Sequence, residues 1–185
     1  LCRGSVPLSA GCSRVAHMFD HDLSDLDAKA TLAAARDSVR TRRLDEVAEL
    51  QVLAHWASLH GTDPTLGPDG HIARRVGNVL VQVGGEGTPG VQDFCLGDIA
   101  LARAAGVMAT RTAIADVLDL QHRLPLTWRR CTAGEAEPWL ARKVARMSRH
   151  LPLACAHVVD TAVARMIDRE APARVLAVAE AKIIE

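Results

Sequence analysis

A series of helix-breaking residues divides the second half of this chain into short segments, and this punctuation constrains the fold more than any other feature. Gly106, Pro125, Gly134, Pro152 and Pro172 mark the breaks. Between them, apolar residues recur every three or four positions, as on one face of an α-helix. These residues are mainly Ala, Leu and Val, and aromatic residues make up only 3% of the chain, which favours closely packed helices over a β-sandwich or barrel. We therefore predict an all-α fold, a multi-helix bundle.

The same pattern predicts where the helices of this half begin and end. Gly106 is expected to end the first helix in a left-handed conformation, and Thr110 to cap the next. Pro138, preceded by Glu137, suits the first turn of a later helix. Helical segments are therefore expected at residues 91–105, 110–124, 126–133, 138–150 and 154–169, and from Pro172 onward.

Residues 24–60 also have a helical pattern, with Ser24 as the expected N-cap and Asp27 three positions later. The polar stretch at residues 40–43 interrupts the apolar stripe, so we expect either one bent helix or two helices that meet there. Residues 61–90 contain eight Gly and three Pro, which excludes a long helix. Only residues 79–83 look extended, and we expect a short strand or hairpin there.

The expected domain organisation is a single helical domain over residues 18–185. It comprises N-terminal helices at 18–60, an irregular loop at 61–90 and a helical core at 91–185 that is truncated at its C-terminus. Residues 1–17 are expected to be a disordered or non-native leader, because Met18 suits a natural start. No apolar run approaches the roughly 20 residues that span a bilayer, so no membrane association is expected. The five Cys contain no Cys-x-x-Cys pair, which favours reduced thiols and a cytoplasmic location over disulfides or structural zinc.

Positive charge is concentrated in the middle of the chain. The formal net charge is zero, but residues 101–150 hold nine basic and four acidic residues. A polyanionic partner would therefore bind this region.

The segment 138–150 is the clearest candidate for such binding. Its core stripe is expected to be Leu140, Val144 and Met147, with a cationic stripe about 200° away around the helix. Together with two arginines on the preceding short helix, the candidate DNA-binding residues are Arg129, Arg130, Arg142, Lys143, Arg146 and Arg149. The alternative is a solvated helix face whose charges pair with Glu135 and Glu137.

Other polar features predict structural roles. The glycine-rich residues 84–90 lack the Gly-Lys-Ser/Thr ending of a phosphate-binding P-loop, so we interpret them as a turn. Asp160 is expected to cap a helix or to pair with Arg165. Trp128 and Trp139 are expected to pack in a core or interface, with base stacking as the alternative. We expect no catalytic centre, no metal site and no cofactor in this chain.

Several short sequence pieces follow one another in a consistent order: residues 85–89 followed by Phe94, 113–118 leading into 123–125, Gly134 after 129–130, 141–145, 159–160 and 181–185. With this ordered set, residues 84–185 resemble the family called domain of unknown function 222, or the 13E12 repeat family, and the stretch ending in Trp56, Leu59 and His60 is similar to its opening helices. The resemblance implies a helical region that is often followed by an HNH nuclease domain, to which a divalent metal would belong. The sequence ends before any His-Asn-His centre, so no nuclease residue is assigned.

These observations predict an accessory module that positions a downstream HNH nuclease on DNA through the basic face of residues 138–150. The alternative is a protein-interaction or dimerisation module that forms a homo-oligomer and binds no DNA. A third alternative is a folded remnant without a function of its own.

Overall fold

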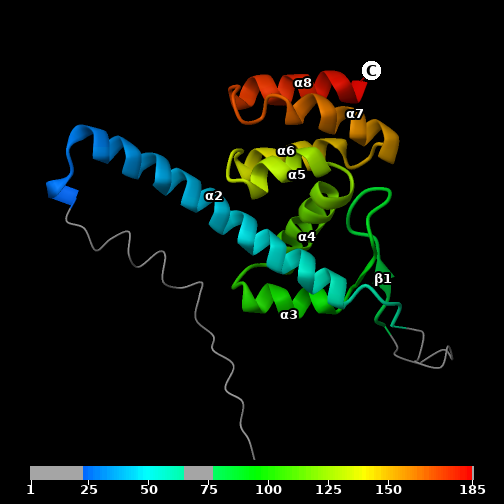
Figure 1. Cartoon of the computed structure of the whole chain (residues 1–185). Coiled ribbons are helices and arrows are strands. Elements are labelled where there is room, and N and C mark those ends of the chain that lie inside the picture. Colours follow the sequence, from blue (N-terminus) through cyan, green and yellow to red (C-terminus); the bar gives the residue numbers. More distant parts are fainter. Residues whose placement is uncertain (1–22, 65–76, 185) are drawn as a thin grey trace, which may run out of the picture. The chain divides into compact units, whose positions relative to one another are not determined.

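The computed structural model describes residues 23–64 and 77–184, and the predicted all-α multi-helix bundle is confirmed (Figure 1). The expected leader, residues 1–17, and part of the expected irregular loop lie outside the described residues. No helix in the described ranges combines the length and apolarity that crossing a membrane requires. The described elements, in order, are η1 (a 3₁₀ turn, Leu23–Asp25), α2 (Ala28–Leu59), β1 (Leu80–Val81), β2 (Val91–Gln92), α3 (Cys95–Ala102), α4 (Val107–His122), α5 (Pro125–Thr132), α6 (Pro138–Ser148), α7 (Leu153–Ala164) and α8 (Pro172–Ile184).

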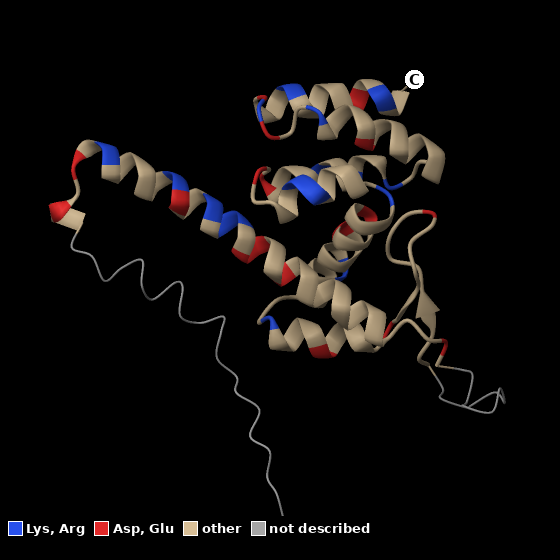
Figure 2. Cartoon of the chain, in the orientation of Figure 1, with Lys and Arg blue, Asp and Glu red and all other residues tan. Residues whose placement is uncertain are grey.

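The long helix α2 is continuous, which decides between the two predicted arrangements of residues 24–60. The polar stretch at 40–43 does not interrupt it. Figure 2 shows basic and acidic residues on the N-terminal part of α2 and neither on its C-terminal part. The expected start at Ser24 is wrong, because residues 23–25 form η1. Asp27 caps the helix instead: its Oδ1 accepts the N–H of Ala30 at 2.7 Å, which satisfies an amide that has no partner within the helix.

The chain divides into two units, residues 1–39 and 40–185, with the division inside α2. In the described part of the first unit no residue is buried. In the second unit, α2 contributes Val47, Leu50 and Leu53 to the hydrophobic interior. The candidate interface and all contacts discussed below belong to the second unit.

A two-stranded antiparallel hairpin follows α2 along the chain. Leu80 lies opposite Gln92 and Val81 opposite Val91. The expected short strand is confirmed, but its partner lies where a helix was predicted, so the predicted helix start at residue 91 is wrong. Val91 is fully buried, and the N–H of Gln92 donates to the carbonyl of His60 at 3.0 Å. Because these backbone groups are engaged in extended structure, α3 begins only at Cys95.

The link between α3 and α4 also differs from the expectation. Ala104, with φ of 51°, adopts the left-handed conformation that was predicted for Gly106. Gly106 is extended and precedes the first residue of α4. Thr110 therefore lies inside α4 and does not cap it: its N–H bonds to the carbonyl of Gly106 at 3.0 Å, and its buried Oγ1 accepts from Arg103 Nη1 at 2.9 Å.

The interior of the second unit consists of two hydrophobic clusters that share α4. Ile114 and Val117 pack with apolar residues of α2 and α3 in one cluster. Leu120 and the following Leu124 pack with α5, α6, α7 and α8 in the other. Figure 1 shows α4 between α3 on one side and α5 and α6 on the other. The faces of α4 are consequently almost all covered by neighbouring helices.

The proline breaks predicted the later helices well. Pro125, Pro138 and Pro172 are the first residues of α5, α6 and α8, where a missing N–H costs no helical bond. α7 ends at Ala164, before the expected residue 169. Capping, one of the two roles expected of Asp160, is confirmed: its carboxylate accepts the N–H groups of Leu126 and Thr127, both at 2.8 Å.

Candidate nucleic-acid interface

Helix α6 carries three of the six predicted DNA-binding residues, Arg142, Lys143 and Arg146, and Arg149 follows it as the C-cap residue. The helix packs against α4, α5 and α8. Leu140 and Val144 are buried as expected, whereas Met147 lies at the edge of the core and is only partly buried. The buried face of α6 is wider than the predicted stripe, because small side chains let the neighbouring helices approach closely. It also includes Ala141, Ala145 and Ser148.

Three of the predicted cations converge on Asp116 of α4. Arg142 Nε donates to Asp116 Oδ2 at 2.9 Å, Arg146 Nη2 donates to the same oxygen at 2.6 Å, and Arg149 Nη2 donates to Oδ1 at 2.9 Å. Asp116 is completely buried, and a buried carboxylate is tolerated only when it is paired and hydrogen-bonded. Hydrogen bonding to Asp116 also raises the pKa of the Arg146 guanidinium above its ordinary value.

A second buried carboxylate, Asp119, extends this cluster to the glycine-rich loop. Its Oδ2 accepts from Arg149 Nε at 2.6 Å, and its Oδ1 accepts the backbone N–H of Gly85 at 2.7 Å. Arg123 is fully buried beside it, with Nε 3.6 Å from Asp119 Oδ1. The guanidinium of Arg123 donates to three backbone carbonyls, those of Glu86, Ser148 and Leu151. The loop at residues 84–90 is thus a structural turn, as predicted, held against α4 by this buried network.

The network accounts for part of the predicted cationic surface. Four guanidinium groups meet two carboxylates, and Glu46 lies 3.7 Å from Arg142, so the cluster keeps a positive excess that is smaller than the sequence suggested. Glu135 and Glu137 do not neutralise these cations: Glu135 binds Arg130, and Glu137 binds Arg42 and Arg43. Lys143 is exposed and forms no ion pair within the described residues.

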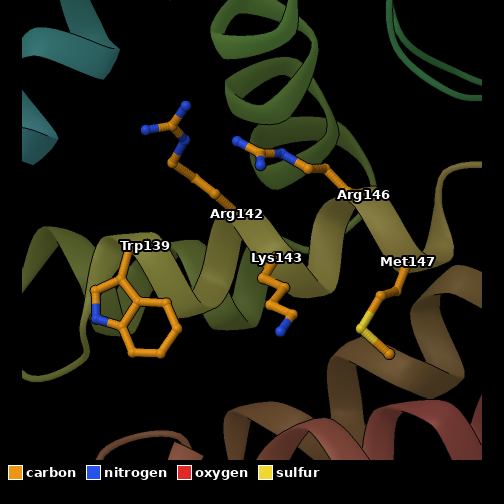
Figure 3. A pocket seen from close by; sticks show the side chains of 5 residues that line it. All are labelled: Trp139, Arg142, Lys143, Arg146 and Met147. Carbon is orange, nitrogen blue, oxygen red and sulfur yellow. The ribbon is translucent and has the colours of Figure 1, made fainter.

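The exposed side of α6 forms an open groove of about 520 Å³, lined by Trp139, Arg142, Lys143, Arg146 and Met147. Figure 3 shows Arg142 and Arg146 reaching toward α4, while the Trp139 ring and Lys143 point to the opposite side of α6 and Met147 lies at the other end of the helix from Trp139. Trp139 is 44% exposed as a residue, and the Arg146 side chain is 47% exposed despite its bonds to Asp116. The groove therefore combines an accessible aromatic surface with fixed positive charge.

The three tryptophans of the chain have different environments. Trp56 packs against the cluster of α2, α3 and α4 and donates from Nε1 to the carbonyl of Cys95 at 3.0 Å. Trp128 packs against both clusters, as predicted for a core residue. Trp139 lies at the surface in the first turn of α6 and is 44% exposed, so of the two expected packing roles, core and interface, the core role is wrong and the interface role stays a prediction.

The remaining candidates, Arg129 and Arg130, lie on α5. Arg130 pairs with Glu135 at 2.7 Å and lies 3.9 Å from Asp168, so it bonds to acids other than those that bind the arginines of α6. Arg129 is exposed. The structure thus brings Arg142, Lys143 and Arg146 together in one groove, and places Arg149 in the buried network.

Sequence reasoning missed the acidic partners of these arginines. A signal for them exists: Asp116 and Asp119 interrupt an otherwise apolar run, residues 113–120, on a helix that had to be buried. Buried acids imply buried bases, and Arg123, four residues after Asp119, is one of them. The sequence could not identify Arg142, Arg146 and Arg149 as the others, because they lie about thirty residues away.

No group of three or more His, Cys, Asp or Glu side chains suited to holding a metal ion occurs among the residues that the structure describes. The arrangement on α6 suits binding of an anion with an apolar or aromatic part. Comparison with known proteins identifies no matching family model, no matching curated protein and no matching solved structure.

Proposed function

We propose that this chain is a nucleic-acid-binding helical module that acts through the groove on α6, as an accessory to an HNH-type nuclease in the cytoplasm. The nuclease association comes from the resemblance to domain of unknown function 222. The binding role is carried by one observation, the juxtaposition of the exposed Trp139 indole with Arg142, Lys143 and Arg146 in one open groove. Proteins that bind nucleic acids commonly pair such cations with an aromatic surface.

The buried carboxylates support this role by fixing the arginines. Arginine side chains lose rotamer freedom when they bind a phosphate, and this loss weakens binding. Asp116 already holds Arg142 and Arg146 through hydrogen bonds of 2.6–3.0 Å. The exposed part of the Arg146 guanidinium and the unpaired Lys143 are then the groups that contact phosphate oxygens.

A titration of labelled DNA, single-stranded and duplex, with the full chain at low salt tests this proposal. We expect binding that weakens as salt increases, with a slope of about 0.7–0.9 in log–log form for each phosphate contacted. Lys143→Glu should weaken binding, whereas Lys29→Glu, the same charge change at an exposed position in the first turn of α2, should not. Absence of binding at low salt, or equal loss in both variants, would contradict the proposal.

A second candidate function, dimerisation, is favoured by apolar side chains exposed where α3 joins α4. Leu101 is 84% exposed and Met108 is 72% exposed, and neighbouring exposed apolar groups can mark a protein interface. Light scattering across a concentration series tests it, with Met108→Glu expected to shift an oligomer toward monomer. A mass that stays monomeric at all concentrations would exclude this second candidate.

A further inference from the structure

We infer that the α6 groove takes an unpaired nucleotide, with its base stacked on Trp139 and its flanking phosphate bound by Lys143 and Arg146. The ligand class would then be single-stranded nucleic acid, and duplex DNA would bind weakly. This inference rests on the proposed function and specifies the ligand of the same groove.

The exposure of Trp139 is the first argument. Trp139 is 44% exposed and lines the groove, so part of its apolar ring surface contacts water, which is unfavourable and which a stacked base would relieve. In a duplex both faces of each base are covered by its neighbours. Only an unpaired or flipped-out base can therefore stack on a side chain at the protein surface.

The spacing of the groups along α6 is the second argument. Trp139 and Lys143 are four positions apart, which places both on the side of α6 that points away from α4, while Arg146, three positions after Lys143, extends toward α4 at the edge of the same groove (Figure 3). With a rise of 1.5 Å per residue, Lys143 lies about 6 Å further along the helix axis than Trp139. The Lys143 ammonium group would thus lie near the phosphate of the nucleotide whose base stacks on Trp139. The exposed part of Arg146 would lie near the following phosphate.

The small size of the cationic surface is the third argument. The groove lies on a helix of 11 residues, and the buried carboxylates Asp116 and Asp119 bind Arg142 and Arg149, which are largely buried. Arg146 also binds Asp116, but its side chain stays 47% exposed, and Lys143 is exposed. A duplex-binding protein usually neutralises several phosphates on both strands. Two accessible cations beside an aromatic ring match one or two nucleotides of a single strand better than a duplex.

Titrations of the full chain with four probes test the inference: single-stranded DNA, single-stranded RNA of the same sequence, the corresponding duplex, and a free mononucleotide. We expect both single strands to bind more tightly than the duplex and the mononucleotide. Tighter binding of the single-stranded DNA than of the single-stranded RNA, or the reverse, would identify which of the two nucleic acids the groove favours. Binding should also quench the intrinsic fluorescence of Trp139.

Variants of the tryptophan separate stacking from charge. Trp139→Ala should lower the affinity for single strands at least about fivefold and abolish the ligand-dependent quenching, while Trp139→Phe should retain most of the affinity. Phe94→Ala, which removes another exposed aromatic group, should change neither. Equal affinity for duplex and single strands, or full affinity in Trp139→Ala, would overturn the stacking inference. If the stacking inference fails in this way but Lys143→Glu still weakens binding, the proposed nucleic-acid-binding function stands without the stacked base. If none of the probes binds, both the proposed function and the stacking inference are wrong.

Discussion

Arg146 Nη2 lies 2.6 Å from Asp116 Oδ2, although 30 positions separate the two residues in the sequence. One partner is completely buried and the other is 47% exposed. The pair therefore links the interior of the second unit to its surface. It holds α6 against α4 and, at the same time, orients a cation at the edge of the groove.

Asp116→Asn should destabilise the protein strongly. The substitution removes a buried negative charge and leaves three guanidinium groups facing a neutral amide, a change that typically costs about 3–5 kcal/mol of unfolding free energy. Urea unfolding followed by circular dichroism measures the change. The control is Asp45→Asn, at an exposed position of α2, which should alter stability by less than about 0.5 kcal/mol. Similar midpoints for the two variants would show that the cluster contributes little to the fold.

Gly85→Ala should also be destabilising, for a steric reason. A Cβ atom at residue 85 would overlap Arg123 Nη1 and the carbonyl oxygen of Arg149, both of which are fixed by the buried network. We expect a loss of about 1–3 kcal/mol. Gly97→Ala lies inside α3, and no atom of the described residues lies within 4 Å of its added Cβ, so it should instead stabilise by about 0.5–1 kcal/mol. Thermal unfolding of both variants measures whether the stability falls in Gly85→Ala and rises in Gly97→Ala. A Gly85→Ala variant as stable as the wild type would contradict the close contact of residue 85 with Arg123 and the carbonyl of Arg149.

Glu137 should contribute a pH-dependent part of the stability. Partial burial opposes its ionisation, but hydrogen bonds from Arg42 and Arg43 outweigh this and hold the pKa of Glu137 below its ordinary value of 4.5. A lowered folded-state pKa means that ionised Glu137 stabilises the fold above pH 4.5, and that this stabilisation is lost as the pH falls through the folded-state pKa.

Glu137→Gln should therefore lower the unfolding free energy at neutral pH by about 0.5–1 kcal/mol, a small effect because Arg42 is more than half exposed and screened by solvent. The difference from the wild type should shrink in acid, below the folded-state pKa. Urea unfolding at several pH values measures it. A difference that stays constant down to acid pH would show that the ionised carboxylate is not the stabilising species.

Cys131 should resist thiol reagents in the folded protein. Burial raises the pKa of its thiol to about 12, and the thiolate is the reactive form. Cys155 is exposed and should be alkylated by iodoacetamide in native buffer, while Cys131 should react only after unfolding in urea. Peptide mass mapping distinguishes the two sites. Equal labelling of both thiols under native conditions would contradict the packing of α5.

The positions of the later helices could be predicted because their signals are local. A proline lacks an N–H and fixes φ, so it favours the first turn of a helix whatever surrounds it. Pro138 and Pro172 therefore marked the starts of α6 and α8 correctly, and α5 begins at Pro125, one residue before the predicted start. The prediction for Gly106 was wrong because Ala104 takes the left-handed conformation. The predicted helix start at Val91 was wrong because Val91 pairs with Val81 in the hairpin.

The sequence by itself determined that the chain forms a helical bundle and that its cations concentrate on the segment that becomes α6. Only the tertiary structure decided which of those cations are internal partners and which remain accessible. Arg149 lies in the buried network while Lys143 faces solvent, because α4 presents Asp116 and Asp119 to one side of α6 alone. Which of these cations are paired depends on the contact between two helices that are distant in sequence, and local sequence propensities carry no information about that contact.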